Sequence, residues 1–176
     1  MKISITFFAL LFNFFLFAQE TENTLNISSL LNKDKMIELP TNAGFFTEKL
    51  GFEPNIFDCT SCKQGFYYQW SATSSYFLNY AQLENGTESL TINNFNNEVT
   101  EGLPFDLVFN SSDEEECYYL FNKYNPVRYQ DSYEVSETEN RAFSVLEFTI
   151  DKLYYKLSFL TNDKLTGVII STAPIQ

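Results

Sequence analysis

No histidine occurs in the sequence, and this absence excludes several classes of catalytic site at once. Histidine is the commonest general base, the usual partner of a catalytic serine and the usual nitrogen ligand of zinc. Cysteine is also scarce, and the one Cys-x-x-Cys pair, Cys59 and Cys62, supplies only two of the four ligands that zinc needs. We therefore expect no metal, no cofactor and no catalytic residue.

Basic residues are few, with 11 Lys and Arg against 23 Asp and Glu and a net charge of −12. Such an acidic chain repels phosphate backbones and anionic lipid, which argues against nucleic acid and favours a basic protein partner. Aromatic residues make up 18% of the sequence, too many for a disordered chain. The chain is also long enough to bury a proper core.

Only one long apolar run is present, over residues 3–17, between Lys2 and the small residue Ala18. A membrane-spanning helix needs about 20 apolar residues, so this run predicts a secretory signal peptide over residues 1–18. The residue directly after the expected cleavage site at Ala18 is Gln19 and not a cysteine, so we expect no lipid anchor. The prediction is an exported protein, periplasmic or secreted, with no membrane span after signal removal.

The first half of the chain predicts a helix followed by a β-meander. After a lead over residues 19–38, in which ISSLLNKDK is a possible short helix, LPTNAGFFTEKLGFEP predicts a helix that begins at Thr41 or Asn42 and ends at Gly51. The stretches GFYYQWS, SYFLNYAQLE and TESLTINNF then predict three strands. Asn85-Gly86 is a strong hairpin signal between the last two.

The second half repeats this order. LPFDLVFNSSDEEECYYLFNKYNP predicts a helix with a capping box of Ser112 and Glu115. Its expected inner stripe is Cys117, Leu120, Phe121 and Tyr124. RAFSVLEFTI, KLYYKLSFL and KLTGVIIS predict three strands with turns at residues 151–152 and 162–163, and the middle strand alternates between a buried and a solvent face.

The order of Leu-Pro, helix, proline and three strands therefore occurs twice, which predicts an α+β fold of two tandem units over residues 39–100 and 101–176. This arrangement resembles the β-lactamase inhibitor protein and the SmpA/OmlA type of small envelope domain. The matching stretches are the two helix-then-proline segments and the closing YYKLSFLTNDKLTGVIIS. The resemblance implies one saddle-shaped sheet whose aromatic-rich concave face grips another protein. The lipidation cysteine expected of an SmpA/OmlA member is absent from this sequence.

The cysteines and the acidic run each have a structural interpretation. In an oxidising envelope Cys59 and Cys62 favour a short disulfide, with free thiols, a metal site or a redox pair as alternatives. Cys117 is expected to be a small buried hydrophobe rather than a nucleophile. Residues 113–116, Asp-Glu-Glu-Glu, suit a helix N-terminus and lack the spacing of a calcium loop.

The aromatic residues of the strands carry the functional hypothesis. Strand alternation cannot place Tyr67, Tyr68 and Trp70 all on the core side, so part of this set must face outwards. A sheet face that displays Tyr, Trp and Asn is typical of a protein-binding surface. The predicted protein-binding residues are Tyr68, Trp70, Asn79, Tyr154 and Lys156.

These observations predict an exported, non-catalytic protein-binding or inhibitory protein that engages a basic partner through aromatic residues on its sheet face. One alternative is an envelope immunity protein that neutralises a delivered toxin. Two others are a structural component of the envelope and a small hydrolase. Carboxylates are plentiful enough for a hydrolase, but nothing in the sequence places two of them opposite each other.

Overall fold

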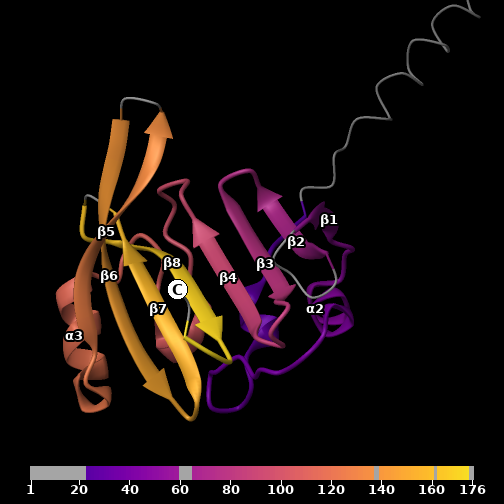
Figure 1. Cartoon of the computed structure of the whole chain (residues 1–176), viewed down its shortest axis with the longest axis horizontal. Helices are drawn as coiled ribbons and strands as arrows, with labels where there is room; N and C mark the ends of the chain where they lie inside the picture. The colour runs from indigo at the N-terminus through magenta and orange to yellow at the C-terminus, as the bar shows by residue number, and fades with distance from the viewer. Residues whose placement is uncertain (1–22, 60–64, 137–138, 161, 175–176) are drawn as a thin grey trace, which may run out of the picture.

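The structure is a computed structural model that describes residues 23–59, 65–136, 139–160 and 162–174. It contains one eight-stranded antiparallel sheet and two short α-helices, an α+β architecture that is mostly sheet (Figure 1). The predicted signal peptide over residues 1–18 lies outside the described residues, as does Cys62. Within the described ranges, no helix has both the length and the apolar character needed to cross a membrane.

The helices lie before each half of the sheet. Their bounds are Ile27–Leu30 (η1, 3-10), Ala43–Leu50 (α2), Pro104–Asp106 (η2, 3-10), Glu114–Phe121 (α3) and Asn122–Tyr124 (η3, 3-10). The predicted ends of α2 are confirmed, because the Asn42 side chain accepts a hydrogen bond from the Phe45 amide and Gly51 has a φ of 81°. The predicted helix in ISSLLNKDK is only the single turn η1.

The predicted cap of α3 is wrong by one residue. Asp113 is the N-cap, and its side chain accepts a hydrogen bond from the Glu116 amide at 2.9 Å. Ser112 is instead engaged by the preceding loop, where its hydroxyl accepts a hydrogen bond from the Val108 amide at 2.9 Å. Leu120, expected on the inner stripe, is 52% exposed, whereas Cys117 and Phe121 are buried.

The sheet is built from two meanders that meet at its centre. The strands are Asn55–Asp58 (β1), Phe66–Thr73 (β2), Tyr76–Gln82 (β3), Glu88–Asn94 (β4), Val127–Ser136 (β5), Glu139–Ile150 (β6), Leu153–Phe159 (β7) and Leu165–Ser171 (β8). Their order in the sheet is β1-β2-β3-β4-β8-β7-β6-β5, so β4 pairs with β8. The sequence predicted only six of these strands and missed the two edge strands, β1 and β5.

The hairpin of β5 and β6 extends beyond the rest of the sheet (Figure 1). Strand β6 pairs with β5 from residue 139 onwards, but it pairs with β7 only from Ser144 to Ile150. The hairpin predicted at Asn85-Gly86 is confirmed, but its loop has three residues rather than two, and Gly86 within it has a φ of 83°. The turn predicted at residues 151–152 is confirmed, since Asp151 and Lys152 both have positive φ between β6 and β7.

One face of the sheet carries the core, because alternate side chains of every central strand point towards the helices. A buried row crosses six strands in register and consists of Trp70, Leu78, Ile92, Val168, Leu157 and Leu146. From α2, Phe46 packs between Trp70 and Tyr80, with ring centroids 5.5 Å and 5.1 Å away. From α3, Phe121 stacks on Phe148 at 4.1 Å. The opposite face is therefore left for solvent or a partner.

Candidate functional site

The face of the sheet opposite the helices, called the open face below, is the candidate surface, and alternate side chains of the strands form it. The alternation predicted for β7 is confirmed, with Leu157 and Phe159 in the core and Lys156 and Ser158 on the open face. The row at its centre crosses all eight strands in register. Its members are Asn55, Gln69, Asn79, Thr91, Ile169, Lys156, Glu147 and Val127.

The middle of the open face is uncharged although the chain carries a net charge of −12. On β2, β3, β4 and β8 the residues on the open face are Tyr67, Gln69, Ser71, Phe77, Asn79, Ala81, Ser89, Thr91, Asn93, Gly167, Ile169 and Ser171. Charged side chains on this face lie on β5, β6 and β7, among them Glu147 and Lys156. An uncharged, partly aromatic centre is typical of a surface that a ligand covers.

Three of the five predicted site residues lie on the open face. The Asn79 side-chain oxygen accepts a hydrogen bond from the Gln69 amide nitrogen at 2.9 Å. The Lys156 ammonium lies 5.6 Å from the centre of the Tyr129 ring, whose hydroxyl donates a hydrogen bond to Glu147 at 3.1 Å. Tyr154, the third, is half-buried and lies opposite Ser171 of β8.

The prediction that Trp70 is a surface anchor is wrong. Strand alternation places Tyr68 and Trp70 on the side of β2 that faces α2, where Trp70 is fully buried and its indole N–H donates to the Phe52 carbonyl at 3.1 Å. Tyr68 is half-buried there and stacks on Trp70 at 6.3 Å. The outward aromatic of this strand is Tyr67, which stacks on Phe57 of β1 at 5.2 Å with the rings 18° from parallel.

Two pockets hollow the open face at opposite ends of its central strands. The first, called the neutral pocket, has a volume of about 620 Å³ and is lined by Tyr67, the β3–β4 turn, the small residues of β3, β4 and β8, and the tail after β8. The second, called the hairpin pocket, has about 660 Å³ and lies at the base of the projecting hairpin. The residues that line it are Asn93, Phe95, Asn97, Arg141, Phe143, Ser158, Leu160, Asn162 and Thr166.

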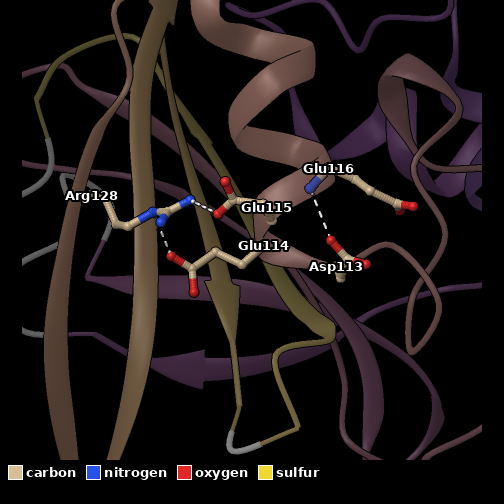
Figure 2. A network of polar contacts seen from close by, with 5 residues as sticks. All are labelled: Asp113, Glu114, Glu115, Glu116 and Arg128. Atoms are coloured by element: carbon tan, nitrogen blue, oxygen red, sulfur yellow. Dashed lines mark hydrogen bonds and ion pairs between the residues drawn. The ribbon is translucent and has the colours of Figure 1, made fainter.

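The acidic start of α3 is occupied by contacts within the chain (Figure 2). The Arg128 guanidinium bridges Glu114 at 2.8 Å and Glu115 at 2.9 Å, while Asp113 caps the helix. The hydrogen bond to Glu115 is the main reason that the pKa of Arg128 is raised. Among the described residues, no group of three or more His, Cys, Asp or Glu side chains is placed to hold a metal ion. These contacts favour the helix-dipole interpretation of the acidic run.

Of the cysteines, Cys117 and Cys59 lie within the described residues. Cys117 is a free thiol buried in the core, as predicted. Burial, followed by the nearby carboxylates of Asp113, Glu116 and Glu114, raises the pKa of this thiol to about 12. The thiol therefore stays protonated at neutral pH and is a poor nucleophile. The predicted Cys59–Cys62 disulfide stays a prediction, since Cys62 lies outside the described residues.

Comparison of the chain with protein families, curated proteins and solved structures found no match. The resemblance to the β-lactamase inhibitor protein and to SmpA/OmlA domains therefore stays a prediction at the level of architecture. A function for this chain has to come from the open face and its two pockets.

Proposed function

We propose that this protein is a non-catalytic protein-binding or inhibitory protein that holds its partner against the open face of the sheet. The observation that carries the proposal is the uncharged centre of that face. The solvent face of an antiparallel sheet is ordinarily polar, whereas here aromatic, amide and small side chains replace the charged ones across β2, β3, β4 and β8. Protein interface cores share two of these features, the depletion of charged residues and the presence of aromatic ones, whereas the serine and alanine side chains are not typical of an interface.

The hairpin pocket supports the proposal because it combines the residue types that anchor partners. Phe95 is 46% exposed and packs edge-on against Phe77 at 6.4 Å. Arg141 and Phe143 line the same pocket from the projecting hairpin. Aromatic and arginine side chains at the centre of an interface supply a large share of its binding energy, provided that a partner removes them from water.

We also propose that the chain consists of two tandem units, each a helix followed by a four-stranded meander. The support is the element order, in which α2 precedes β1 to β4 and α3 precedes β5 to β8. The last strands of the two meanders, β4 and β8, pair at the centre of the sheet. Such a pairing joins the solvent-facing sides of the two meanders into the single open face. The resemblance to the β-lactamase inhibitor protein implies the same arrangement for a protein-binding saddle.

The proposed partner is a basic protein met outside the cytoplasm. The net charge of −12 attracts a basic surface at long range, and the signal peptide expected over residues 1–18 would export the chain to the periplasm or medium. An envelope immunity protein is the same proposal with a delivered toxin as the partner. It would use the same open face.

The proposal is tested by site-specific photo-crosslinking in an envelope extract of the source organism. A photoreactive residue is placed at Thr91, at the centre of the open face, and a matched one at Asn122, which is exposed beside α3. We expect one discrete protein adduct from position 91 and none of that mass from position 122. Equal adducts from both positions, or none from position 91, would contradict the proposal.

A further inference from the structure

The floor of the neutral pocket is made of small side chains that lie side by side on three neighbouring strands. Ala81 of β3 lies opposite Ser89 of β4, which lies opposite Ser171 of β8. Neighbouring strands are about 4.8 Å apart, so this floor is about 10 Å wide. The pocket volume of about 620 Å³ lies within the usual range for small-molecule sites, about 300–1,000 Å³.

An aromatic platform stands beside this floor. Tyr67 lines the pocket from β2, and its ring is stacked nearly parallel on Phe57, at 5.2 Å between centroids. Phe57 is 40% exposed at the edge of the sheet. A flat, accessible ring of this kind offers an apolar surface with a polar hydroxyl at its tip.

The polar groups of the pocket have unused hydrogen-bonding capacity. The side-chain oxygens of Asn79 and Asn85 accept hydrogen bonds from Gln69 and from the Thr87 amide, which orients both amide groups. Within the part of the chain that the structure describes, the NH₂ groups of these two asparagines and the hydroxyls of Ser89 and Thr91 have no partner. The pocket therefore presents oriented donors together with hydroxyls that both donate and accept.

The chemistry of the lining selects the class of ligand. The described lining residues are all uncharged, so an ionic ligand would lose its hydration without gaining a counter-charge. A purely apolar ligand would bury the amides and hydroxyls without hydrogen-bond partners, which is unfavourable. A ligand with many hydroxyls and an apolar C–H face satisfies both the polar groups and the Tyr67 ring.

We infer that the neutral pocket binds a neutral saccharide, with one sugar ring against Tyr67 and its hydroxyls hydrogen-bonded to Asn79, Asn85 and Thr91. This site is separate from the anchors of the hairpin pocket. Along β4, Ser89 and Thr91 line the neutral pocket, whereas Asn93 lines the hairpin pocket. The sugar site is therefore distinct from the hairpin-pocket anchors, but it shares Thr91 with the centre of the open face, so a protein partner that covers Thr91 would also cover the sugar site.

The test uses isothermal titration and amide NMR with four probes: cellotriose, maltotriose, tri-N-acetylchitotriose and the charged trigalacturonate. We expect at least one neutral trisaccharide to bind with a Kd of about 1 mM or tighter, and to shift the amide signals of Ser89 and Thr91. Trigalacturonate should bind at least about tenfold more weakly than that sugar, a difference of about 1.4 kcal/mol.

Two variants locate the sugar, and two controls separate it from other surfaces. Tyr67→Ala removes the platform and Ser89→Gln fills the floor, so each should weaken binding at least about tenfold while the circular dichroism spectrum stays unchanged. Phe95→Ala, in the hairpin pocket, and Tyr119→Ala, exposed on α3, should leave sugar affinity unchanged. The inference is overturned if no neutral trisaccharide binds, if trigalacturonate binds equally well, or if the folded pocket variants bind normally. None of these results bears on the hairpin pocket, where Phe95→Ala tests the protein partner separately from the sugar.

Discussion

Trp70 and Tyr154 show how the position of one residue on a strand decides its role. Both are aromatic, and the sequence suggested that both face a partner. Trp70 has no exposed surface, because its ring packs against Phe46 of α2 and its indole N–H is bonded to Phe52. The side chain of Tyr154 lies on the other face of the sheet, the open face, where it is half-buried. One aromatic therefore stabilises the core, and the other is available for contact.

We expect Trp70→Ala to cost about 3–5 kcal/mol in the free energy of unfolding, because it leaves a large cavity between α2 and the sheet. Tyr154→Ala, at a half-exposed position, should cost less than about 1.5 kcal/mol. Urea denaturation followed by circular dichroism measures both. If Trp70→Ala does not fold, Trp70→Phe replaces it and should still cost more than Tyr154→Ala. Equal losses from the Trp70 and Tyr154 variants would show that Trp70 is not a core residue.

Cys117 gives a prediction about pH. Burial raises the pKa of its thiol from 9.0 to about 12, so the unfolded chain loses this proton at lower pH than the folded chain does. The free energy that the protonated Cys117 thiol contributes to folding is fully present below about pH 9 and is lost as the pH rises towards about 12. Tyr76 acts in the same direction, since burial raises the pKa of its phenol from 10.0 to about 12.

We therefore expect the free energy of unfolding to fall between about pH 9 and about pH 12, and to fall less steeply in Cys117→Val, which keeps a small apolar side chain without a titrating proton. Urea unfolding at a series of pH values measures both slopes. Identical slopes for the natural chain and the variant would mean that the thiol does not titrate differently on folding.

At the scale of helices and strands, the sequence predicted the elements whose burial pattern is regular. The alternation of β7, the glycine of the β3–β4 turn and the Asn42 cap of α2 are all local signals, and all are confirmed. The two edge strands were missed for different reasons. All four residues of β1 are exposed, so it has no buried face that produces a period of two. Strand β5 does alternate, with Val127, Tyr129, Tyr133 and Val135 separated by polar residues, so the signal that could have found it is present in the sequence.

The candidate site was only partly predictable for a related reason. Alternation shows that Tyr67, Tyr68 and Trp70 cannot share a face, but it does not say which face the helices cover. The face that the helices cover is fixed by Phe46 of α2, which packs on Trp70 and Tyr80. These residues lie far from Phe46 in the sequence, so no local pattern predicts the contact. The two pockets likewise depend on strand register across β3, β4 and β8, which the sequence alone did not supply.

The α3 cap gives a prediction at the same scale. Asp113→Ala removes the acceptor for the Glu116 amide and should cost about 1 kcal/mol in the free energy of unfolding. Asp113→Asn keeps a side-chain oxygen and should cost only a few tenths, because the contact to Lys164 is long, at 3.7 Å, and about a third exposed. Thermal and urea unfolding compare the two variants. If Asn costs as much as Ala, the charge of Asp113 matters rather than its cap.

For the whole molecule, the distribution of charge separates how a partner approaches from how it is held. The net charge of −12 acts at long range, whereas the centre of the open face is uncharged and acts only on contact. We expect the association rate of a basic partner to fall as salt is added, with little change in its dissociation rate. Stopped-flow or surface-binding kinetics at several ionic strengths would show this. A rate that is independent of salt would contradict the expectation of a basic partner.

Phe95 should affect the dissociation rate of the partner. Phe95→Ala removes a ring that is 46% exposed in the free protein and that a partner in the hairpin pocket would bury. We expect the affinity to drop by about 2 kcal/mol or more, mainly through faster dissociation. Tyr119→Ala removes a ring that is 68% exposed on α3 and should change neither rate constant. Equal effects of the two variants would place the contact elsewhere.

The most direct test of the central claim, that the open face holds a protein partner, is the affinity of the crosslinked partner for a matched pair of charge insertions. Thr91→Arg puts a long charged side chain at the uncharged centre of the open face, and Asn122→Arg puts the same side chain on the exposed surface beside α3. Calorimetry should show at least about a hundredfold loss of affinity, about 2.7 kcal/mol, for Thr91→Arg and less than about twofold for Asn122→Arg, with both variants folded. Full affinity for Thr91→Arg, or an equal loss in both variants, would contradict the claim.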